Sequence, residues 1–332
     1  MIRFASVGTG WIAGEFIKGT RGVLGLEYAA CYSRSRETGE KFAAQWGAGT
    51  VYTDLEQMAK DSTIDAVYIA SPNALHYAQS KLFLEHGKHV ICEKPITVEP
   101  EQLEELQALA AQKGLVYMEA LIGVYLPETK ILKETVEKLG QVHLARIDFS
   151  QYSSKYPAYL AGKTPNIFNP QMATGGLMDL GIYCVYPALM LFGIPESVSA
   201  HARFLRTGAD GSGCVTLGYP DKTVVLTYSK TAQGTIGSEI QGENGVIKIP
   251  RISKLTDMTF TPVGGEPIAL TNYTDKYLQM SHEAEAFYRF IKKPEETQEL
   301  YHEVQKLSLD VSRVMKQARE SAQIRFDFQQ KL

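Results

Sequence analysis

The sequence predicts an α/β protein of two domains, with a doubly wound parallel sheet in the first and a hairpin-rich antiparallel sheet in the second. Its 332 residues exceed what one ordinary hydrophobic core holds. In the first third, short apolar runs alternate with helical patterns, which is typical of parallel strands joined by helices. Further on, alternating runs are separated by turn residues, which is typical of antiparallel hairpins. We place the domains at residues 1–121 and 122–332.

The composition excludes several classes of protein. The chain is 44% hydrophobic and 21% charged, as globular proteins are, and its net charge is −3 without a long basic run. We therefore expect neither a nucleic-acid partner nor a membrane partner. The four cysteines are scattered without a CxxC pair, and the histidines show no ligand spacing, so we predict no disulfide framework and no metal.

The expected location of the protein is the cytoplasm. The N-terminus begins directly with a strand-like run and has no signal-peptide layout. The apolar stretch 177–194 resembles a membrane span in length, but it contains Asp179, Gly181 and Pro187 and lacks charged flanks. We interpret it as a buried helix of a soluble protein.

The elements of the first domain follow one another as strand and helix. Strands are predicted at residues 2–7, 26–32, 66–70, 88–92 and 115–120, and helices at 11–18, 37–46, 54–59, 77–86 and 101–113. Asp54 is placed to cap the third helix, and Gly87 ends the fourth.

The second domain is predicted to begin with a strand at 142–151 and a long loop at 153–172. A helix follows Gly175 and Gly176, and two long helices end the domain at 277–292 and 295–322, before a short strand or tail at 324–328. Between these helices lie the alternating runs 197–206, 213–219, 223–229, 235–241, 245–250 and 257–262. A long ordered loop such as 153–172 is often functional, and this one is positioned to cover a substrate.

The first strand leads directly into Gly8-Thr9-Gly10-Trp11-Ile12-Ala13, which opens a helix. In this context Gly8 permits a tight turn, Gly10 lets the backbone approach a pyrophosphate, and Ala13 allows close helix–strand packing. The free N–H groups of the helix would hold the anion. The alternative is a glycine-rich turn without a ligand. We interpret the motif as a dinucleotide-binding site.

The end of the second strand indicates which dinucleotide binds. NAD sites usually carry Asp or Glu there, whereas this chain has Ser33-Arg34-Ser35-Arg36. Hydroxyl and guanidinium groups bind a 2′-phosphate, and no carboxylate repels it. We therefore favour NADP over NAD, with NAD possible. The alternative is that the arginines are solvated residues opening the next helix.

Several motifs together resemble the glucose–fructose oxidoreductase / inositol dehydrogenase (Gfo/Idh/MocA) family. They are Gly8-Thr9-Gly10, Ser71-Pro72-Asn73 with His76, Glu93-Lys94-Pro95, Met118-Glu119-Ala120 and Gly175-Gly176-Leu177-Met178-Asp179-Leu180-Gly181-Ile182-Tyr183. The resemblance covers most of the chain. It implies an N-terminal Rossmann domain followed by an α+β domain with a large, mostly antiparallel open sheet. It also implies a homodimer or higher homo-oligomer formed through that sheet.

The resemblance implies an NAD(P)-dependent oxidoreductase acting on a sugar, a polyol or a dihydrodiol-like substrate. Two alternatives exist: a glycosidase that uses a tightly held NAD, or a sugar or cofactor sensor without catalysis. The chain departs from the family pattern at Val124 and Leu126, where many relatives have Arg and His. We expect this difference to affect the substrate rather than the redox chemistry.

The implied catalytic residues are Lys94, Asp179 and Tyr183, with the active site in the cleft between the domains. Tyr183 is the candidate acid/base, Lys94 would lower the pKa of that phenol, and Asp179 would orient the substrate hydroxyl or the lysine. Asp179 and Tyr183 share a helix face at i, i+4 spacing. The candidate cofactor-binding residues are Gly8, Thr9, Gly10, Trp11, Ile12, Ser33, Arg34, Ser71, Asn73, His76, Glu93, Lys94 and Glu119.

Overall fold

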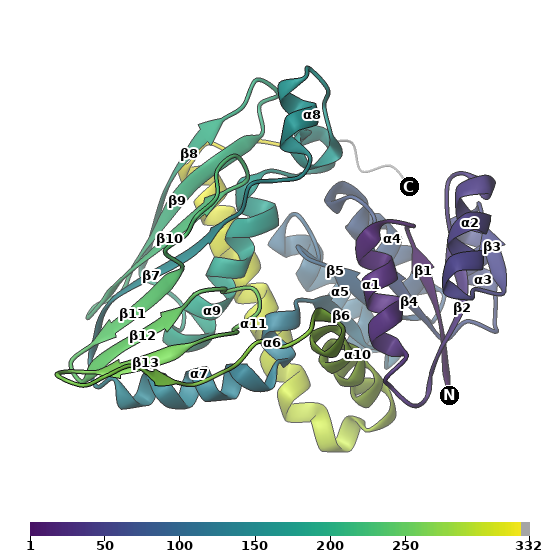
Figure 1. The fold of residues 1–332 in the computed structure, drawn as a ribbon. Coiled ribbons are helices and arrows are strands. Elements are labelled where there is room, and N and C mark those ends of the chain that lie inside the picture. The colour runs from purple at the N-terminus through teal and green to yellow at the C-terminus, as the bar shows by residue number, and fades with distance from the viewer. Residues whose placement is uncertain (327–332) are drawn as a thin grey trace. The chain divides into compact units, whose positions relative to one another are not determined.

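The computed structural model describes residues 1–326. It divides into two compact units (Figure 1). The first unit contains residues 1–122 and 275–306. The second contains residues 123–274 and the described residues from 307 onwards. The chain therefore leaves the first unit, builds most of the second, and returns to the first before it ends.

The first unit is built on a six-stranded sheet in the order β3-β2-β1-β4-β5-β6. All neighbouring strands are parallel. The order reverses between β1 and β4, which is where ligands bind in open sheets of this kind. The strands are β1 (Ile2–Val7), β2 (Leu26–Tyr32), β3 (Thr50–Tyr52), β4 (Ala66–Ile69), β5 (His89–Glu93) and β6 (Tyr117–Ala120).

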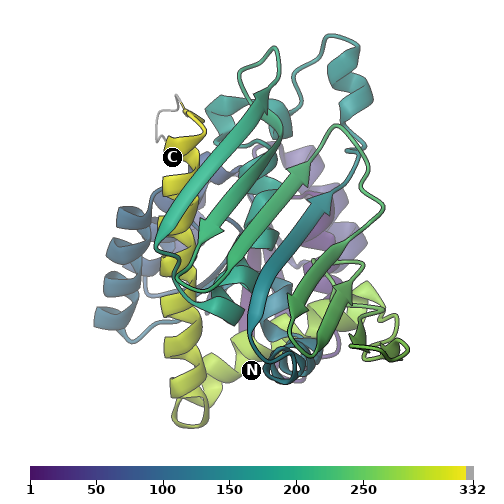
Figure 2. The same ribbon diagram turned by 90° about the vertical axis from the view of Figure 1, so that its left-hand side faces the viewer.

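The second unit is built on an eight-stranded sheet in the order β14-β13-β12-β11-β7-β10-β9-β8. Its neighbours are antiparallel except for β7 and β10, which run parallel. Figure 2 looks onto this sheet, with helix α9 behind it. The strands are β7 (Val142–Ser150), β8 (Ser197–Phe204), β9 (Asp210–Gly218), β10 (Thr223–Ser229), β11 (Ser238–Gly242), β12 (Gly245–Ile249), β13 (Thr259–Pro262) and β14 (Ile268–Ala269).

Helices complete each unit. The first unit has α1 (Trp11–Thr20), α2 (Arg36–Trp46), α3 (Leu55–Lys60), α4 (Asn73–Glu85), α5 (Pro100–Lys113) and α10 (Lys276–Lys292). Around the second sheet lie α7 (Pro127–Lys138), α8 (Tyr156–Leu160), a π-helical turn η3 (Leu177–Gly181) and α9 (Ile182–Phe192). Short pieces occur at α6 (Ile122–Tyr125), η1 (Asn166–Phe168) and η2 (Pro170–Met172), and α11 (Pro294–Ser321) runs through both units.

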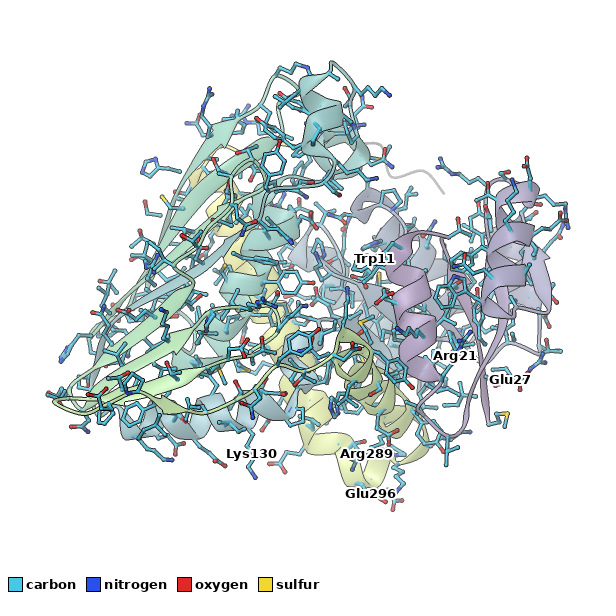
Figure 3. All side chains as sticks on the ribbon, in the orientation of Figure 1. Trp11, Arg21, Glu27, Lys130, Arg289 and Glu296 are labelled. Carbon is cyan, nitrogen blue, oxygen red and sulfur yellow. The ribbon has the colours of Figure 1, made fainter. Side chains whose placement is uncertain are left out.

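Aromatic packing and the late helix α10 stabilise the first unit. The rings of Phe16 and Tyr68 stack at 4.0 Å, and both side chains are almost fully buried. Helix α10 packs against α1 so closely that a Cβ on Gly19 would come within 2.7 Å of Met280 Cβ. At the start of α1, the Trp11 ring lies under the Lys276 ammonium at 3.6 Å; Figure 3 labels Trp11. Helix α10 is therefore an integral part of the first unit, although it lies far from the strands of that unit in the sequence.

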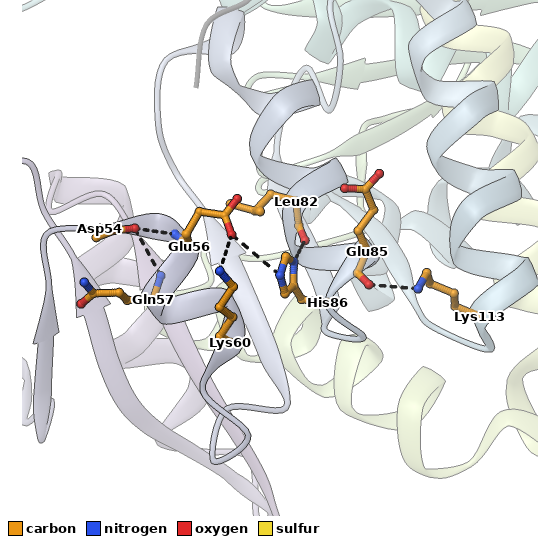
Figure 4. Close-up of polar contacts among 8 residues, drawn as sticks. All are labelled: Asp54, Glu56, Gln57, Lys60, Leu82, Glu85, His86 and Lys113. Carbon is orange, nitrogen blue, oxygen red and sulfur yellow. Dashed lines mark hydrogen bonds and ion pairs between the residues drawn. The ribbon is translucent and has the colours of Figure 1, made fainter.

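Side-chain caps explain where several helices begin. The Ser35 hydroxyl accepts the Thr38 N–H at the start of α2, and the Asp54 carboxylate accepts the Glu56 and Gln57 N–H groups at the start of α3 (Figure 4). These contacts satisfy N–H groups that have no partner inside the helix. The same figure shows the Lys113 ammonium donating to the Glu85 carbonyl at 2.9 Å.

The helix that carries Asp179 is buried rather than membrane-exposed. The segment Pro170–Phe192 is apolar enough to cross a membrane, but 67% of its most apolar window lies inside the protein. Helix α9 packs against β7 and β10. This is the environment of a core helix in a soluble α/β fold.

The predicted fold class is confirmed, and most strands and helices lie where the sequence placed them. The sequence missed the short edge strands β3 and β14, the short helix α6 and the helix α7. Residues 324–326 are not in a strand, which agrees with the tail rather than the strand among the two alternatives for 324–328, and residues 327–328 lie outside the described part. The domain boundary after residue 121 stays a prediction. The helix over 276–292 belongs to the first compact unit.

Candidate active site

The glycine motif lies at the carboxyl end of β1, as predicted. Gly8 has φ +107°, and a Cβ there would lie 2.7 Å from the Ala70 carbonyl oxygen at the end of β4. Gly10 caps α1 without a side-chain hydrogen bond, and a Cβ on it would meet no atom within 4 Å. Gly8 is therefore required by the protein's own packing, whereas Gly10 leaves space beside the helix N-terminus. These residues fit a bound pyrophosphate.

The end of β2 carries no acidic side chain, and its arginines differ in their contacts. Ser33 is buried, and its hydroxyl accepts the Ser35 N–H at 3.3 Å. Arg36 forms an i, i+4 ion pair with Glu40 at 3.6 Å. Arg34 is exposed, and its guanidinium takes part in no ion pair within residues 1–326. Arg34 is thus the arginine better placed to contact a cofactor phosphate.

His76 connects two loops at the carboxyl ends of the strands. Its ring is fully buried, with Nδ1 2.8 Å from the Pro95 carbonyl and Nε2 2.8 Å from the Ser71 carbonyl. Burial lowers the pKa of His76, although both carbonyls favour the charged ring. Both ring nitrogens are therefore occupied by backbone, which favours a role in positioning the loops. Its predicted cofactor contact stays a prediction.

Glu119 holds the other side of the loop that carries Lys94. This carboxylate is 7% exposed and accepts the Ile96 N–H at 2.9 Å. The bond between Lys94 and Pro95 is cis. Glu119 and His76 thus fix the backbone directly after Lys94, whose side chain is half-buried. The sequence analysis named Glu119 as a candidate cofactor-binding residue, but it did not indicate this anchoring contact.

Glu93 lies in a cluster of charged groups that the sequence did not reveal. The Tyr68 hydroxyl donates to Glu93 at 2.5 Å. Glu283 of α10 is 1% exposed, and its Oε1 has no hydrogen-bond partner among the described residues. Burial raises the pKa of Glu93 and, together with Glu93, raises that of Glu283 well above its usual range; Lys276 opposes both shifts. The charge of Glu93 thus adds to burial in favouring the protonated form of the Glu283 carboxyl.

The glycines of the second signature make room for Asp210. A Cβ on Gly175 would overlap Asp210 Oδ1, and a Cβ on Gly176 would lie 2.8 Å from the Tyr228 ring. Asp210 is fully buried, and its Oδ2 accepts the Leu177 N–H at 2.7 Å. This carboxylate therefore caps the helix that carries Asp179. Sequence reasoning missed it because Asp210 lies at the start of β9, 33 residues after Leu177.

Asp179 and Tyr183 are the accessible residues of an otherwise buried helical segment. Between Leu177 and Leu189, Asp179 and Tyr183 are partly exposed, and all the remaining residues are buried. Asp179 lies in the π-helical turn η3, and Tyr183 in the first turn of α9. π-Helical turns frequently occur at functional sites, because they shift side chains from the regular helix face. The Tyr183 ring packs edge-on against Phe149 at 5.3 Å.

Asp179 forms an ion pair with a second lysine, Lys230, which the sequence analysis did not identify. Lys230 directly follows β10, and its side chain is 2% exposed, whereas the Asp179 side chain is 35% exposed. The Lys230 ammonium also lies 5.7 Å from the Phe168 ring centroid in the loop 153–172. No sequence motif marks Lys230, since only the pairing of β10 with β7 and β9 brings it to this helix.

The loop 153–172 is ordered by aromatic and guanidinium contacts. The Arg206 guanidinium lies 3.8 Å above the Tyr159 ring and donates to the Tyr159 and Lys163 carbonyls at 2.6 Å each. Asn169 caps η2 by accepting the Gln171 N–H, which is a structural role within this loop. Of the two positions that depart from the family pattern, Leu126 is buried and Val124 is half-buried.

The predicted residues thus form two groups. In the first unit, the glycine motif and residues 33–34, 71–76, 93–94 and 119 all lie at the carboxyl ends of the sheet strands. In the second unit, Asp179 and Tyr183 share one helical segment with Lys230 beside it. Within residues 1–326, no group of three or more His, Cys, Asp or Glu side chains is arranged to hold a metal ion.

Comparison with known proteins agrees with this arrangement. Residues 2–121 match the model of the oxidoreductase family with an NAD-binding Rossmann fold, and residues 131–248 match the GFO/IDH/MocA C-terminal domain. A scyllo-inositol 2-dehydrogenase (NADP(+)) from Bacillus subtilis (strain 168) is 40% identical over 96% of this chain and 96% of its own length. The chain belongs to the GFO/IDH/MocA family of oxidoreductases. This confirms the family resemblance, the enzyme class and the nicotinamide-dinucleotide cofactor.

Two further comparisons extend this result. A mouse trans-1,2-dihydrobenzene-1,2-diol dehydrogenase is 30% identical to the chain, over 80% of this chain and 78% of its own length. The crystal structure of a 3-ketoreductase from Actinomadura kijaniata, in complex with NADP and TDP-benzene, superposes with a TM-score of 0.86 at 21% identity. It covers 98% of this chain and 99% of the other, and it supports the fold alone.

Proposed function

We propose that this oxidoreductase is an NADP-preferring dehydrogenase that oxidises one secondary hydroxyl of an uncharged polyol, or reduces the corresponding ketone. The observation that carries this proposal is the pairing of Asp179 with Lys230 beside the accessible Tyr183. Because the carboxylate and the ammonium neutralise each other, this pair presents a hydrogen-bonding group without net charge, which suits a substrate hydroxyl. The name of the 40%-identical relative, a scyllo-inositol dehydrogenase, also favours a cyclitol.

The proposed division of labour follows from the chemistry of each side chain. NADP, when bound, supplies the site for hydride transfer. Tyr183 accepts the hydroxyl proton during oxidation and returns it during reduction, as a general base and acid. Asp179 accepts a hydrogen bond from a substrate hydroxyl. Lys94 donates hydrogen bonds, and its positive charge stabilises negative charge that develops on the reacting oxygen.

The preference for NADP rests on the end of β2. The exposed Arg34 and the hydroxyl-bearing Ser33 stand where NAD sites usually have a carboxylate. The names of the bacterial relative and of the 3-ketoreductase structure both mention NADP. We expect Arg34→Ala to weaken NADP binding at least tenfold more than NAD binding. Equal losses of affinity for both cofactors would contradict the role of Arg34. The matched control is Lys41→Ala on α2, which should leave the affinity for both cofactors unchanged.

The proposed function is tested by following absorbance at the reduced-nicotinamide band with NADP or NAD. The panel contains scyllo-inositol, other cyclitols, aldoses and trans-dihydrodiols. We expect turnover with at least one cyclitol, a strong loss in Lys94→Met, and a large fall in kcat in Tyr183→Phe. Hydrolysis of a glycoside without net cofactor reduction would support the glycosidase alternative. Binding of polyol and cofactor without turnover would support the sensor.

We further propose that the protein is cytoplasmic and forms a homodimer through the face of the eight-stranded sheet that Figure 2 shows. That face carries partly exposed apolar side chains, such as Leu144, Val225 and Val246, among polar ones. Light scattering after size-exclusion chromatography tests this proposal. A wild-type dimer that Val225→Lys converts to a monomer would support it, and a wild-type monomer would contradict it.

A further inference from the structure

Lys230 is buried to a degree that is unusual for a lysine. Its side chain is 2% exposed, and its backbone N–H donates to the Gly211 carbonyl at 2.8 Å. Placing an ammonium group in a protein interior costs several kcal/mol unless it is paired and hydrogen-bonded. A lysine in this position therefore needs a carboxylate close by, and Asp179 provides it.

The two other buried or half-buried aspartates around this helical segment have different partners. Asp210 accepts the Leu177 N–H. Asp148 of β7 accepts the hydroxyl groups of Ser150 and Thr227 at 2.8 and 2.5 Å. The remaining titratable or charged side chains on the packed elements are His143, Arg146, Tyr183, Cys184, Tyr186, Cys214 and Tyr228. The ion pair with Lys230 therefore distinguishes Asp179 from these two aspartates, which accept hydrogen bonds from a backbone N–H and from hydroxyl groups.

The pair is asymmetric in its accessibility. The Asp179 side chain is 35% exposed, while Lys230 is almost completely enclosed. A substrate hydroxyl can therefore approach Asp179, whereas Lys230 faces protein atoms, including the Phe168 ring of the loop 153–172. Lys230 acts through Asp179 rather than on the substrate, and it also links Asp179 to that loop.

We propose that Lys230 is a positioning residue for Asp179 in the second unit: its enclosed ammonium keeps the Asp179 carboxylate ionised and fixed in the orientation that accepts a substrate hydroxyl beside Tyr183. This inference rests on the proposed polyol oxidoreductase function. Without the ammonium, Asp179 would take up a proton at higher pH and would occupy several rotamers. Substrate orientation would then be lost while the cofactor unit stays intact.

The experiment compares Lys230→Met, Lys230→Arg and the control Lys222→Met in the full-length protein. Lys222 is a suitable control because it is also paired with an aspartate, Asp221 at 2.6 Å, at the other end of the same strand β10. We measure kcat and KM for the polyol from pH 5 to 9, the Kd of NADPH, and the melting temperature. If Lys230→Met does not fold, Lys230→Gln takes its place.

We expect Lys230→Met to lower kcat/KM for the polyol at least a hundredfold and to move its acid limb upward by about one pH unit or more, because an opposite charge at this range favours the ionised carboxylate. The Kd of NADPH should stay within twofold of the wild type. Lys230→Arg should restore the acid limb and most of the activity, since it retains the charge. Lys222→Met should match the wild type throughout.

Two results would overturn the inference. In one, Lys230→Met keeps the wild-type pH profile and kcat/KM. In the other, Lys230→Met and Lys230→Arg lose activity equally without any change in the acid limb, which would indicate packing alone. Failure of the proposed function is distinct, because the wild-type enzyme itself would then turn over no polyol.

Discussion

The carboxylate of Asp210 fills the position that a Cβ on Gly175 would take. The same carboxylate accepts the Leu177 N–H at 2.7 Å and so caps the helical segment with Asp179 and Tyr183. The glycine and the aspartate therefore depend on each other, although 35 positions separate them in the sequence. This dependence can be tested by mutation.

We expect Gly175→Ala to destabilise the protein by about 1–3 kcal/mol, because overpacking a buried site forces neighbours to move. The measurement is the free energy of unfolding in urea. Gly123→Ala is the control, since a Cβ there meets no atom within 4 Å. In Asp210→Ala, which vacates the space, the added Gly175→Ala change should cost clearly less than in the wild type. Equal costs in both backgrounds would contradict the proposed dependence.

The two glycines of the first motif should respond differently to alanine. Gly8→Ala should destabilise the fold, because Gly8 has a positive φ and lies against the Ala70 carbonyl. Gly10→Ala should leave the melting temperature within about 2 °C of the wild type, yet weaken NADP binding at least tenfold, since only a bound cofactor could meet the new Cβ. Isothermal titration and thermal melting check both variants. Unchanged NADP affinity in Gly10→Ala would refute the pyrophosphate assignment.

Asp210 should make the protein less stable as the pH rises from 4 to 6. Burial raises the pKa of its carboxyl to about 6. The native state therefore binds a proton that the unfolded state has released, and stability present below pH 4 is lost as the pH passes through 6. This effect amounts to at most about 3 kcal/mol. The variant Asp210→Asn has no carboxyl to titrate and should not show this loss. Its free energy of unfolding, compared with that of the wild type, should therefore rise as the pH increases from 4 to 6.

His89 should have the opposite pH dependence. Burial lowers the pKa of its ring to about 4, and its Nδ1 accepts the Val116 N–H at 2.9 Å. The unfolded state therefore binds a proton more readily, and stability present above pH 6.5 is lost as the pH falls towards 4, by up to about 3 kcal/mol. His89→Asn retains an acceptor and cannot be protonated. Its urea midpoint should fall less than that of the wild type between pH 7 and pH 4.5; parallel curves would contradict this assignment.

The sequence predicted the elements whose signals are local. The glycine motif, the Asp54 cap and the alternating runs each depend on residues within a few positions of one another, and all appear in the structure. The edge strand β3 was missed because three residues are too short for a periodic pattern. Helix α7 was missed although Pro127 stands at its first turn, where proline is favoured.

The site was predictable only where its residues lie in motifs. Lys94, Asp179 and Tyr183 were found through such motifs, and their catalytic roles stay proposals. Lys230, Asp210 and Glu283 were missed because each acts through a contact with a residue far away in the sequence. The amino-acid composition does not show which charged residues are buried. Only the folded structure shows which carboxylate forms an ion pair with an enclosed lysine.

The path of the chain between the two units has a consequence for engineering. Between residues 1 and 326 the chain passes from one unit to the other at 122–123, 274–275 and 306–307. A fragment ending at residue 121 would lack α10 and leave the α1 face around Gly19 without its partner Met280. Residues 123–274 are in effect an insertion within the nucleotide-binding unit. Exchanging the whole second unit between relatives therefore requires three junctions, because the described residues from 307 onwards also belong to it, and α10 must stay with its original first unit.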